Sequence, residues 1–393
     1  MVLIFRSVNS LRRLKNGGKI LKKRILHIVL SLGTGGLENG IVNIINGCDP
    51  DKFHIDVLCL RELGELASRI ENKDTRVFFF ENSHQGLRTA VSQINSVCKK
   101  NDYQIIHTHG WATMLAGYLA SLFNRKLIVM NGEHGTLYFD TWRQKALQKF
   151  LFNRMTINLS VSAVLVEEIA KRFQVSTDRF HPILNGVDVV RFAPDRNQKN
   201  KKRKDLGMQK GQFVIGSVGR LVEVKNYPCL LKAFSSISAK NPDARLVLAG
   251  DGPERKNLED LANKLNISAF VKFLGRRDDI PAIMNTFDVF VLPSFREGLS
   301  NTILEAMSSG LPAVVSNVGG NPEIVVDHET GRLFETNNSI ELSNILAELS
   351  NNQDMTNRMA SSARKHILDN YSLATMVDNY QVIYEQLISK GKL

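Results

Sequence analysis

Residues 294–307 read SFREGLSNTILEAM and place two glutamates, Glu297 and Glu305, on either side of a glycine turn. The apolar run Val289 to Leu292 just before them predicts a buried strand, so we expect Glu297 on the loop after that strand and Glu305 on the next helix. A helix start presents unpaired N–H groups and the positive end of the helix dipole. The turn is therefore a candidate site for an anion such as a diphosphate, held by the backbone of Leu299, Ser300, Asn301 and Thr302.

The same residues fit a second local interpretation. Thr302 followed three residues later by Glu305 is the pattern of a capping box, in which the glutamate accepts a hydrogen bond from the backbone N–H of the cap residue. A basic pair upstream favours anion binding, because residues 219–226 read GRLVEVKN and supply Arg220 and Lys225. Arginine offers a planar fork to phosphate oxygens, and lysine offers a compact charge.

These two motifs resemble those of the large group 1 (family 4) of retaining glycosyltransferases. Members carry two glutamates separated by seven residues, and an upstream Gly-Arg-Leu with a lysine five residues after the arginine; this chain has both. The resemblance extends over nearly the whole chain from about Arg24. This chain departs from the family pattern at Asn226, where members have a glycine after the lysine.

The resemblance implies roles for the charged residues. Glu297 would contact hydroxyls of a donor sugar near the reacting carbon, and Glu305 would bind the ribose hydroxyls of the nucleotide. Arg220 and Lys225 suit the stabilisation of the leaving diphosphate, which gathers negative charge as the glycosidic bond breaks. Arg276, within Gly-Arg-Arg, lies where family members contact the base.

A glycine-rich turn, GTGGLE at residues 33–38, follows the first predicted strand and opens a helix. Such a turn lets the backbone approach a phosphate or a sugar, but by itself it is also typical of a tight strand-to-helix connection without a ligand. The resemblance places Gly35 and Gly36 beside the donor diphosphate.

Two further motifs of the first half contain histidines. Residues 105–110 read IIHTHG, and the alternation of a strand puts His107 and His109 on one face. Metal binding is conceivable, but the sequence shows no third ligand, and a hydrogen-bonded polar strand end is the commoner arrangement. The resemblance assigns His109 to orienting the donor sugar and stabilising the transition state, and leaves His107 structural. His134, in NGEHG after the next predicted strand, is either part of the acceptor side or an ordinary turn residue.

Short apolar runs alternate with longer helical patterns along the chain, which predicts an α/β protein with two doubly wound parallel sheets. Strands are predicted at residues 25–30, 55–60, 77–80, 105–107, 127–130 and 157–161, and again at 213–218, 245–249, 271–274, 289–292 and 313–316.

The resulting Rossmann-like domains would span residues 25–195, on the acceptor side, and 212–372, on the nucleotide-sugar side, joined by a basic linker at 196–211. Open α/β sheets bind ligands beyond the carboxyl ends of their strands, so we expect the site in a crevice between the two domains. The resemblance implies the GT-B architecture, in which a C-terminal helix, here residues 373–389, crosses back to the first domain.

The net charge of +12 is concentrated in residues 1–24, which carry eight Lys or Arg and no acid. This basic tail is open to three interpretations: a floppy segment, an anchor to anionic lipid, or a targeting signal. The basic clusters do not alternate with aromatic residues, which argues against nucleic acid as a partner.

No apolar run approaches the ~20 residues that span a bilayer. Four cysteines without paired spacing suit a reducing cytosol.

The predicted activity is transfer of a sugar from a UDP- or GDP-sugar to an acceptor hydroxyl, without a metal or other cofactor. Retention of configuration is implied by the resemblance alone, since the sequence offers no clear covalent nucleophile. The family's common work on bacterial surface polysaccharides favours a saccharide or lipid-linked saccharide acceptor at the cytoplasmic face of the cell membrane, with the enzyme bound peripherally. A nucleotide-sugar epimerase and a catalytically silent scaffold subunit are the alternatives.

Overall fold

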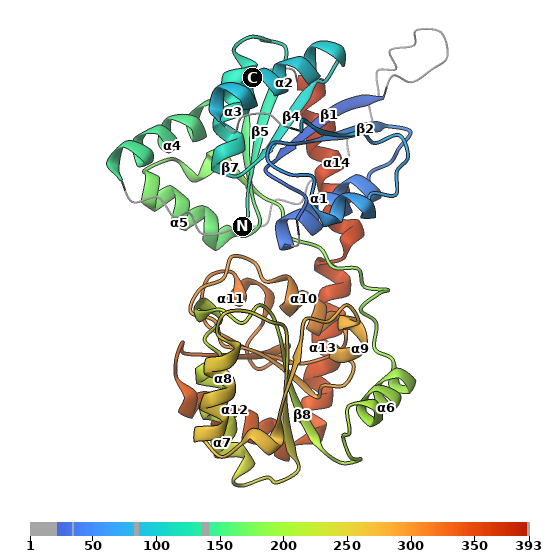
Figure 1. Cartoon of the computed structure of the whole chain (residues 1–393), viewed down its shortest axis with the longest axis vertical. Coiled ribbons are helices and arrows are strands. Elements are labelled where there is room, and N and C mark those ends of the chain that lie inside the picture. The colour runs from blue at the N-terminus through green and yellow to red at the C-terminus, as the bar shows by residue number, and fades with distance from the viewer. Residues whose placement is uncertain (1–21, 34, 82–85, 135–140, 391–393) are drawn as a thin grey trace.

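The chain folds into two lobes, each built on a parallel β-sheet (Figure 1). The computed structural model describes residues 22–33, 35–81, 86–134 and 141–390. The first lobe has a seven-stranded sheet in the order β3-β2-β1-β4-β5-β6-β7, and the second has a six-stranded sheet in the order β10-β9-β8-β11-β12-β13. The predicted α/β class with two doubly wound sheets is confirmed.

The strands of the first lobe are β1 (Lys23–Val29), β2 (Phe53–Cys59), β3 (Val77–Phe79), β4 (Ile105–His109), β5 (Ile128–Glu133), β6 (Ile157–Ser160) and β7 (Phe180–Pro182). Its helices are α1 (Gly36–Gly47), α2 (Leu87–Lys100), α3 (Trp111–Ser121), α4 (Trp142–Arg154), α5 (Ala163–Phe173) and α14 (Leu373–Lys390), with short 3₁₀ turns η1 (Glu65–Arg69) and η2 (Thr177–Arg179).

The strands of the second lobe are β8 (Phe213–Val218), β9 (Ala244–Ala249), β10 (Val271–Gly275), β11 (Val289–Leu292), β12 (Ala313–Ser316) and β13 (Gly331–Phe334). Its helices are α6 (Arg196–Asp205), α7 (Tyr227–Ser238), α8 (Arg255–Lys264), α9 (Ile280–Met284), α10 (Asn301–Ser308), α11 (Asn321–Ile324), α12 (Ser339–Asn351) and α13 (Gln353–Asn370), with 3₁₀ turns η3 (Glu223–Lys225) and η4 (Ser268–Phe270).

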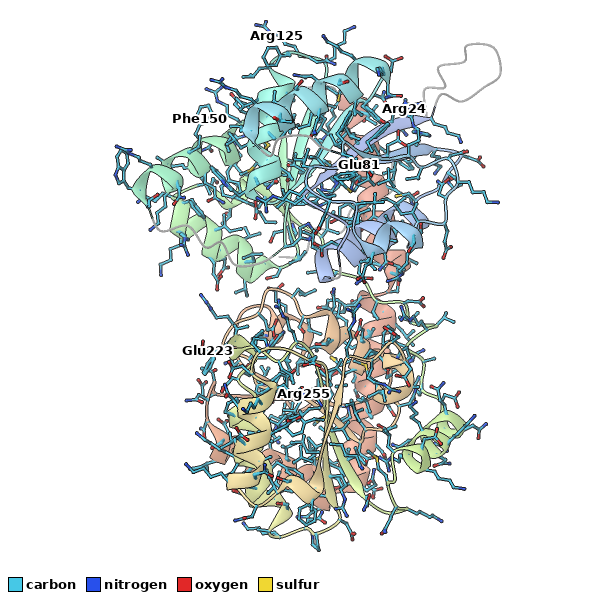
Figure 2. All side chains as sticks on the ribbon, viewed as in Figure 1. Arg24, Glu81, Arg125, Phe150, Glu223 and Arg255 are labelled. Atoms are coloured by element: carbon cyan, nitrogen blue, oxygen red, sulfur yellow. The ribbon has the colours of Figure 1, made fainter. Side chains whose placement is uncertain are left out.

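Central strands are the most apolar segments of the chain, because helices cover both faces of each sheet. All six residues of β8 are buried, and β8, β11 and β12 have the bounds predicted from their apolar runs. The edge strands β7 and β13 were not predicted, because they are partly exposed and their sequences, FHP and GRLF, are not apolar runs. Charged side chains such as Arg125 and Glu223 lie exposed on the first and second lobe respectively (Figure 2).

The last helix, α14, returns to the first lobe, as predicted. Its side chains Met376, Val377, Tyr380 and Tyr384 are buried in one apolar cluster with residues of β1, β2 and α1. The preceding helix α13 belongs to the second lobe, so the chain crosses between lobes at residues 371–373 (Figure 1). A β-bridge between Val187 and Ser372 joins this crossing to the segment after β7, where the chain first passes from the first lobe to the second.

The segment predicted as a basic linker, residues 196–211, is largely helical. Its helix α6 is attached to the second lobe by ion pairs. Lys199 and Arg203 pair with Asp288 at 2.9 Å and 2.6 Å, and Lys202 pairs with Asp279 at 2.5 Å. A run of like charges looks unstructured in sequence because the acids that neutralise it are more than 70 residues away. The linker prediction was therefore wrong for residues 196–205.

The basic tail predicted at residues 1–24 lies outside the described residues up to residue 21. Its last two residues, Lys23 and Arg24, belong to β1, so the first strand begins two residues earlier than predicted. Among the described helices, none is both long and apolar enough to cross a membrane.

Candidate functional site

The start of α10 has the features of an anion site. The side chain of its cap residue, Ser300, bonds no backbone N–H of the helix; its hydroxyl instead makes a hydrogen bond with that of Thr302 at 3.1 Å. Among the described residues, none accepts a hydrogen bond from the backbone N–H groups of residues 299–302. The capping-box interpretation was wrong, because no described N–H donates to the Glu305 carboxylate. These four N–H groups therefore have no partner within the described part of the chain.

Lys225 and Glu297 meet beside this helix start. Lys225 Nζ lies 2.6 Å from Glu297 Oε1, and the hydroxyl of Ser294 donates to the same oxygen at 2.5 Å. The two loops that carry them are joined by a backbone bond from Phe295 N–H to the Val224 carbonyl at 2.8 Å. The structure therefore brings together two residues that lie 72 positions apart in sequence.

The other predicted cation, Arg220, is exposed on the loop after β8. No described residue pairs with its guanidinium, so it is available to a ligand. Arg276 follows β10 of the second lobe. Its guanidinium forms an ion pair with Glu65 of the first lobe at 3.3 Å. Its predicted contact with a nucleotide base remains a prediction.

Glu305 projects from α10 into a half-buried position. Burial raises the pKa of its carboxyl to about 7, and the nearby positive charge of Arg191 acts in the opposite direction. A carboxylate with two free oxygens can accept hydrogen bonds from two neighbouring hydroxyls. Arg191 was not predicted as a site residue, because only the packing of the segment after β7 against α10 brings it close.

The glycine turn of the first lobe reaches the same place. A Cβ atom on Gly36 would lie 2.9 Å from Nδ2 of Asn301, so the turn and the side chain of Asn301 are close neighbours and a larger residue would displace that amide. The amide of Asn185, on the segment that links the lobes, donates to Asn301 Oδ1 at 3.0 Å. Gly35 caps α1 at this turn. Predicted residues from both lobes thus converge on the start of α10.

The histidines of the first lobe form one cluster. His107 and His109 on β4 lie beside His27 on β1, because the parallel register pairs His27 with His107. His27 Nδ1 is 3.0 Å from His109 Nε2, and His109 Nδ1 is 3.0 Å from His134 Nε2. Residues 131–133, predicted to follow a strand, are part of β5, which leaves His134 at its end. His27 was missed because only the strand order places it there.

Three of these histidines could also be metal ligands. His27, His107 and His109 each offer a ring nitrogen, and these atoms lie within 4.8 Å of one another. However, both nitrogens of His27 and of His109 take part in hydrogen bonds, and only His107 Nε2 is without a partner among the described residues. The distances are those of a hydrogen-bonded cluster, and the absence of a metal stays a prediction.

Burial keeps the cluster neutral. It lowers the pKa of His27 to about 3 and that of His134 to about 4, and it holds the pKa values of His107 and His109 well below the usual value. Each ring therefore carries one N–H and one lone pair at pH 7. In this conformation His109 has no nitrogen left for a sugar hydroxyl, contrary to the simplest form of its predicted role.

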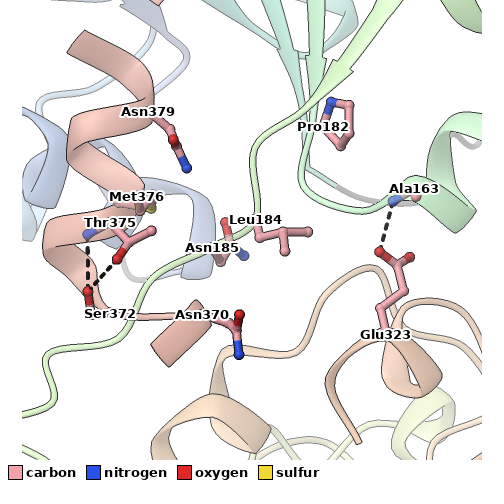
Figure 3. Close-up of a pocket in the computed structure, with 10 residues that line it drawn as sticks. All are labelled: Ala163, Pro182, Leu184, Asn185, Glu323, Asn370, Ser372, Thr375, Met376 and Asn379. Atoms are coloured by element: carbon pink, nitrogen blue, oxygen red, sulfur yellow. Dashed lines mark hydrogen bonds between the residues drawn. The ribbon is translucent and has the colours of Figure 1, made fainter. Parts of the chain in front are cut away.

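A second-lobe carboxylate ties the lobes together. Glu323 of α11 accepts hydrogen bonds at the start of α5: from the hydroxyl of the cap residue Ser162 at 2.7 Å, and from the N–H groups of Ala163 at 2.9 Å and Val164 at 2.8 Å. Figure 3 shows Glu323 directed at Ala163 beside a cavity of about 330 Å³ between the lobes. A carboxylate at a helix N-terminus is stabilised by the free N–H groups and the dipole.

Glu323→Gln should weaken this contact. An amide accepts through only one oxygen, and its NH₂ group would oppose the N–H groups of α5, so we expect a loss of about 1–3 kcal/mol, as for a hydrogen bond to a charged group. The change is measurable as a lower thermal midpoint and a larger radius of gyration by X-ray scattering. Glu329→Gln, an exposed glutamate on the same loop region, is the control. Equal behaviour of the two variants would contradict a role for Glu323 in holding the lobes.

A buried carboxyl in β5 makes stability depend on pH. Burial raises the pKa of Glu133 to about 7, partly offset by a hydrogen bond from the Asn131 amide at 2.8 Å. A raised folded-state pKa means that the stabilising protonated form is complete below the unfolded pKa, near 4.5, and is lost as pH rises through 7.

Glu133→Gln should remove this dependence, because glutamine keeps an acceptor oxygen for Asn131 but cannot ionise. Relative to wild type, the variant should gain up to about 3 kcal/mol on going from pH 4 to pH 8. Thermal unfolding at both pH values measures the difference, with the exposed Glu167→Gln as control. A difference from wild type that is the same at both pH values would show that Glu133 does not titrate there.

Two family models match the chain: glycosyltransferase family 4 over residues 34–191 and glycosyl transferases group 1 over residues 198–366. The chain is 29% identical to the UDP-Gal:α-D-GlcNAc-diphosphoundecaprenol α-1,3-galactosyltransferase of Escherichia coli, covering 93% of this chain and 98% of the relative. It is 30% identical to EpsF of Bacillus subtilis, which is named as a glycosyltransferase, over 75% and 79% of the two chains.

The fold is also that of a solved structure. HepE of Anabaena in complex with UDP and glucose superposes with a TM-score of 0.82 and 24% identity, covering 92% of this chain and 99% of HepE. At this level of identity the similarity concerns the fold, and it agrees with the two-lobed GT-B architecture.

Proposed function

Since the chain belongs to the group 1 (family 4) glycosyltransferases, we propose that it transfers a sugar from a UDP-sugar to a hydroxyl of a lipid-linked saccharide, with retention of configuration. UDP is favoured over GDP because the E. coli relative uses UDP-Gal, and because HepE was solved with UDP and glucose. The relatives named above are glycosyltransferases and lend no support to an epimerase or a scaffold subunit.

The observation that carries the proposal is the meeting of Lys225, Glu297 and the free N–H groups of α10 at one point, opposite Gly36. The diphosphate would lie on the backbone of residues 299–302, with Lys225 and Arg220 on its oxygens. Glu305 would accept from the ribose hydroxyls. The sugar would extend toward Glu297 and toward the first-lobe histidines His109 and His134.

In the proposed reaction the bond between the anomeric carbon and the diphosphate oxygen breaks, and a bond from the same carbon to the acceptor oxygen forms on the same face. The acceptor proton passes to the departing diphosphate, which leaves as UDP. Lys225, Arg220 and the helix N–H groups stabilise the charge that grows on the diphosphate, which is why we propose a metal-independent reaction without a cofactor. Closure of the lobes would exclude water that could hydrolyse the donor.

The acceptor and the location are proposed from the E. coli relative and from charge. That relative has a diphosphoundecaprenol-linked acceptor, which supports work at the cytoplasmic membrane face. The basic residues 1–24 would attract an anionic membrane surface. Flotation with liposomes of phosphatidylglycerol, with the full chain and with a chain lacking residues 1–21, tests this. Equal recovery in the lipid fraction would rule out a role for the tail.

The activity is tested by a donor screen. A ligand that binds only the folded state raises the thermal midpoint, so UDP-sugars should stabilise the chain more than GDP-sugars. The best donor is then incubated with GlcNAc-diphosphoundecaprenol, and the anomeric configuration of the product is read by NMR. An inverted product would refute the retaining mechanism. Conversion of the donor alone into an isomeric nucleotide-sugar would favour the epimerase instead.

A further inference from the structure

The helix α4 turns apolar side chains both inward and outward. Its inner side buries Gln148, Leu151 and Phe152 in the first lobe. Its exposed side chains include Trp142, Arg143, Leu147, Lys149, Phe150 and Arg154. A helix on the surface of a soluble protein normally presents a polar face to water. Three large apolar residues on the outer side of one short helix therefore make this face a candidate contact surface.

The end of α3 continues this face. Leu122 and Phe123, which directly follow α3, are 55% and 78% exposed, and Arg125 close behind them is exposed as well. Tyr118 of α3 packs edge-to-face against Phe150 of α4, with ring centroids 5.7 Å apart. Arg125 and Phe150 both lie at the outer edge of the first lobe (Figure 2). We call residues 122–126 together with the exposed residues of α4 the α3–α4 surface.

A cavity of about 360 Å³ opens within the α3–α4 surface. Its lining residues include Tyr118, Ser121, Arg125, Arg154 and Thr156. No described acid forms an ion pair with either arginine, and the guanidinium of Arg154 lies 5.1 Å from the centroid of the Phe150 ring. The planar fork of arginine matches the oxygens of a phosphate, and neighbouring hydroxyls supply further donors. The cavity is therefore suited to a phosphate group.

The charge of this region has one sign. Residues 103–166 contain six Lys or Arg and two acids. One acid, Glu133, is buried, and the other, Asp140, lies outside the described residues. Neither α3 nor α4 contains an acid, and the next acids along the chain, Glu167 and Glu168, belong to α5. Positive charge beside exposed apolar side chains favours a partner that is anionic at its surface and apolar beneath it.

A bilayer of anionic phospholipid has both properties. Helices that lie in a membrane surface combine Trp, Phe and Leu with Lys and Arg, and tryptophan is enriched at the boundary between headgroups and acyl chains. The position of α4 also suits this partner. The helix follows β5, whose carboxyl end carries His134, and it ends before β6, so it runs from the site edge of the sheet to the opposite edge. A bilayer against α4 is thus beside the edge that carries the site.

We propose that the α3–α4 surface docks on an anionic phospholipid bilayer. Phe123 and Trp142 insert between the headgroups, while Arg125 and Arg154 bind a lipid phosphate. The choice of a membrane as partner rests on the proposed function, which gives the chain a lipid-linked acceptor. The inference adds a folded contact to the attraction proposed for the basic residues 1–24.

The electrostatic part is tested with vesicles of phosphatidylglycerol and the full-length protein. Sedimentation with increasing lipid gives a partition coefficient. Arg125→Gln/Arg154→Gln should lower it about 25-fold, since each basic residue at an anionic surface contributes about fivefold. The matched control is Lys256→Gln/Lys264→Gln, two exposed lysines of α8 in the second lobe. This control should change the coefficient little, because charges farther than a Debye length from the lipid are screened.

The apolar part is tested on the same vesicles. Phe123→Ser/Trp142→Ser removes two side chains that are 78% and 74% exposed, and it should lower the partition coefficient at least about tenfold. Ile340→Ser on α12 of the second lobe is the control, because this isoleucine is also 74% exposed. The exposed positions leave the core unchanged, and the thermal midpoint of each variant verifies that it is folded.

Trp142 reports the contact directly. The sequence has two tryptophans, Trp111 and Trp142, so Trp142→Phe leaves Trp111 as the only indole. Phosphatidylglycerol with brominated acyl chains quenches an indole that reaches the acyl region. Emission of the wild-type protein should fall when it binds such vesicles, and Trp142→Phe should remove most of this fall.

The proposal is overturned if Arg125→Gln/Arg154→Gln binds vesicles as tightly as the Lys256→Gln/Lys264→Gln control, or if brominated lipid quenches Trp142→Phe as much as wild type. A dimer that Phe123→Ser/Trp142→Ser converts to a monomer, measured by light scattering, would also overturn it, since a second copy would then cover the surface. Vesicle binding needs no nucleotide-sugar. Normal transfer in detergent without these binding differences counts against docking alone, and normal docking without any transfer counts against the proposed activity alone.

Discussion

Replacing Lys225 by alanine is expected to lower kcat for sugar transfer by roughly 10²–10³-fold, the cost of removing one preorganised group that stabilises developing charge. The diphosphate gains negative charge as the glycosidic bond breaks, so the ammonium contributes more in the transition state than in the bound donor. KM for the donor should therefore change much less than kcat.

The control is Lys232→Ala, an exposed lysine of the neighbouring helix α7. It removes the same charge from the same lobe but lies outside the loop that carries Lys225. Steady-state rates with the donor identified by the screen measure both variants. If Lys225→Ala raises KM and leaves kcat intact, the lysine only binds the donor and has no special role in the departure of the diphosphate.

Glu297→Gln is expected to lower kcat by about 100-fold, close to 2.7 kcal/mol, while donor binding stays the same or becomes tighter. The carboxylate would lie near the anomeric carbon, where positive charge develops as the diphosphate leaves. In the bound ground state the same negative charge repels the diphosphate, and it also occupies Lys225 at 2.6 Å. A neutral amide removes the repulsion and the transition-state stabilisation together.

The different effects on binding and on turnover distinguish a catalytic role of Glu297 from a structural one. For Glu297→Gln, UDP binding by calorimetry should be unchanged or tighter, while kcat by UDP release should fall. Glu223→Gln, an exposed glutamate two residues before Lys225, should change neither (Figure 2). Weaker UDP binding together with lower kcat in Glu297→Gln would instead indicate that the loop after β11 has lost its shape.

Local patterns in the sequence predict the frame of this protein well. The apolar runs of β8, β11 and β12 predict their bounds, because a strand buried on both faces is mostly apolar. The glycine turn before α10, with a carboxylate on either side, likewise indicates an anion site, since free N–H groups follow from any helix start. These features depend on contacts between residues close in the chain.

Contacts between distant segments could not be read from these patterns. The basic run of α6 looks like a linker until Asp279 and Asp288 are placed beside it. The cap that Glu323 places on α5 joins residues 159–161 positions apart. The sequence around a charged residue does not reveal its partner, because it looks the same whether the side chain is solvated or paired.

The histidine cluster shows which contacts could be predicted from the sequence and which could not. Alternation along one strand predicted that His107 and His109 share a face, because side chains repeat every two residues in any strand. Only the strand order, which sets β1 against β4, and the return of α14 add His27 and Tyr384 and engage both nitrogens of His109. The sequence by itself determined which residues have the chemistry for a nucleotide-sugar, and the tertiary structure decided which of their atoms remain free, because hydrogen-bond partners are assigned by packing in space.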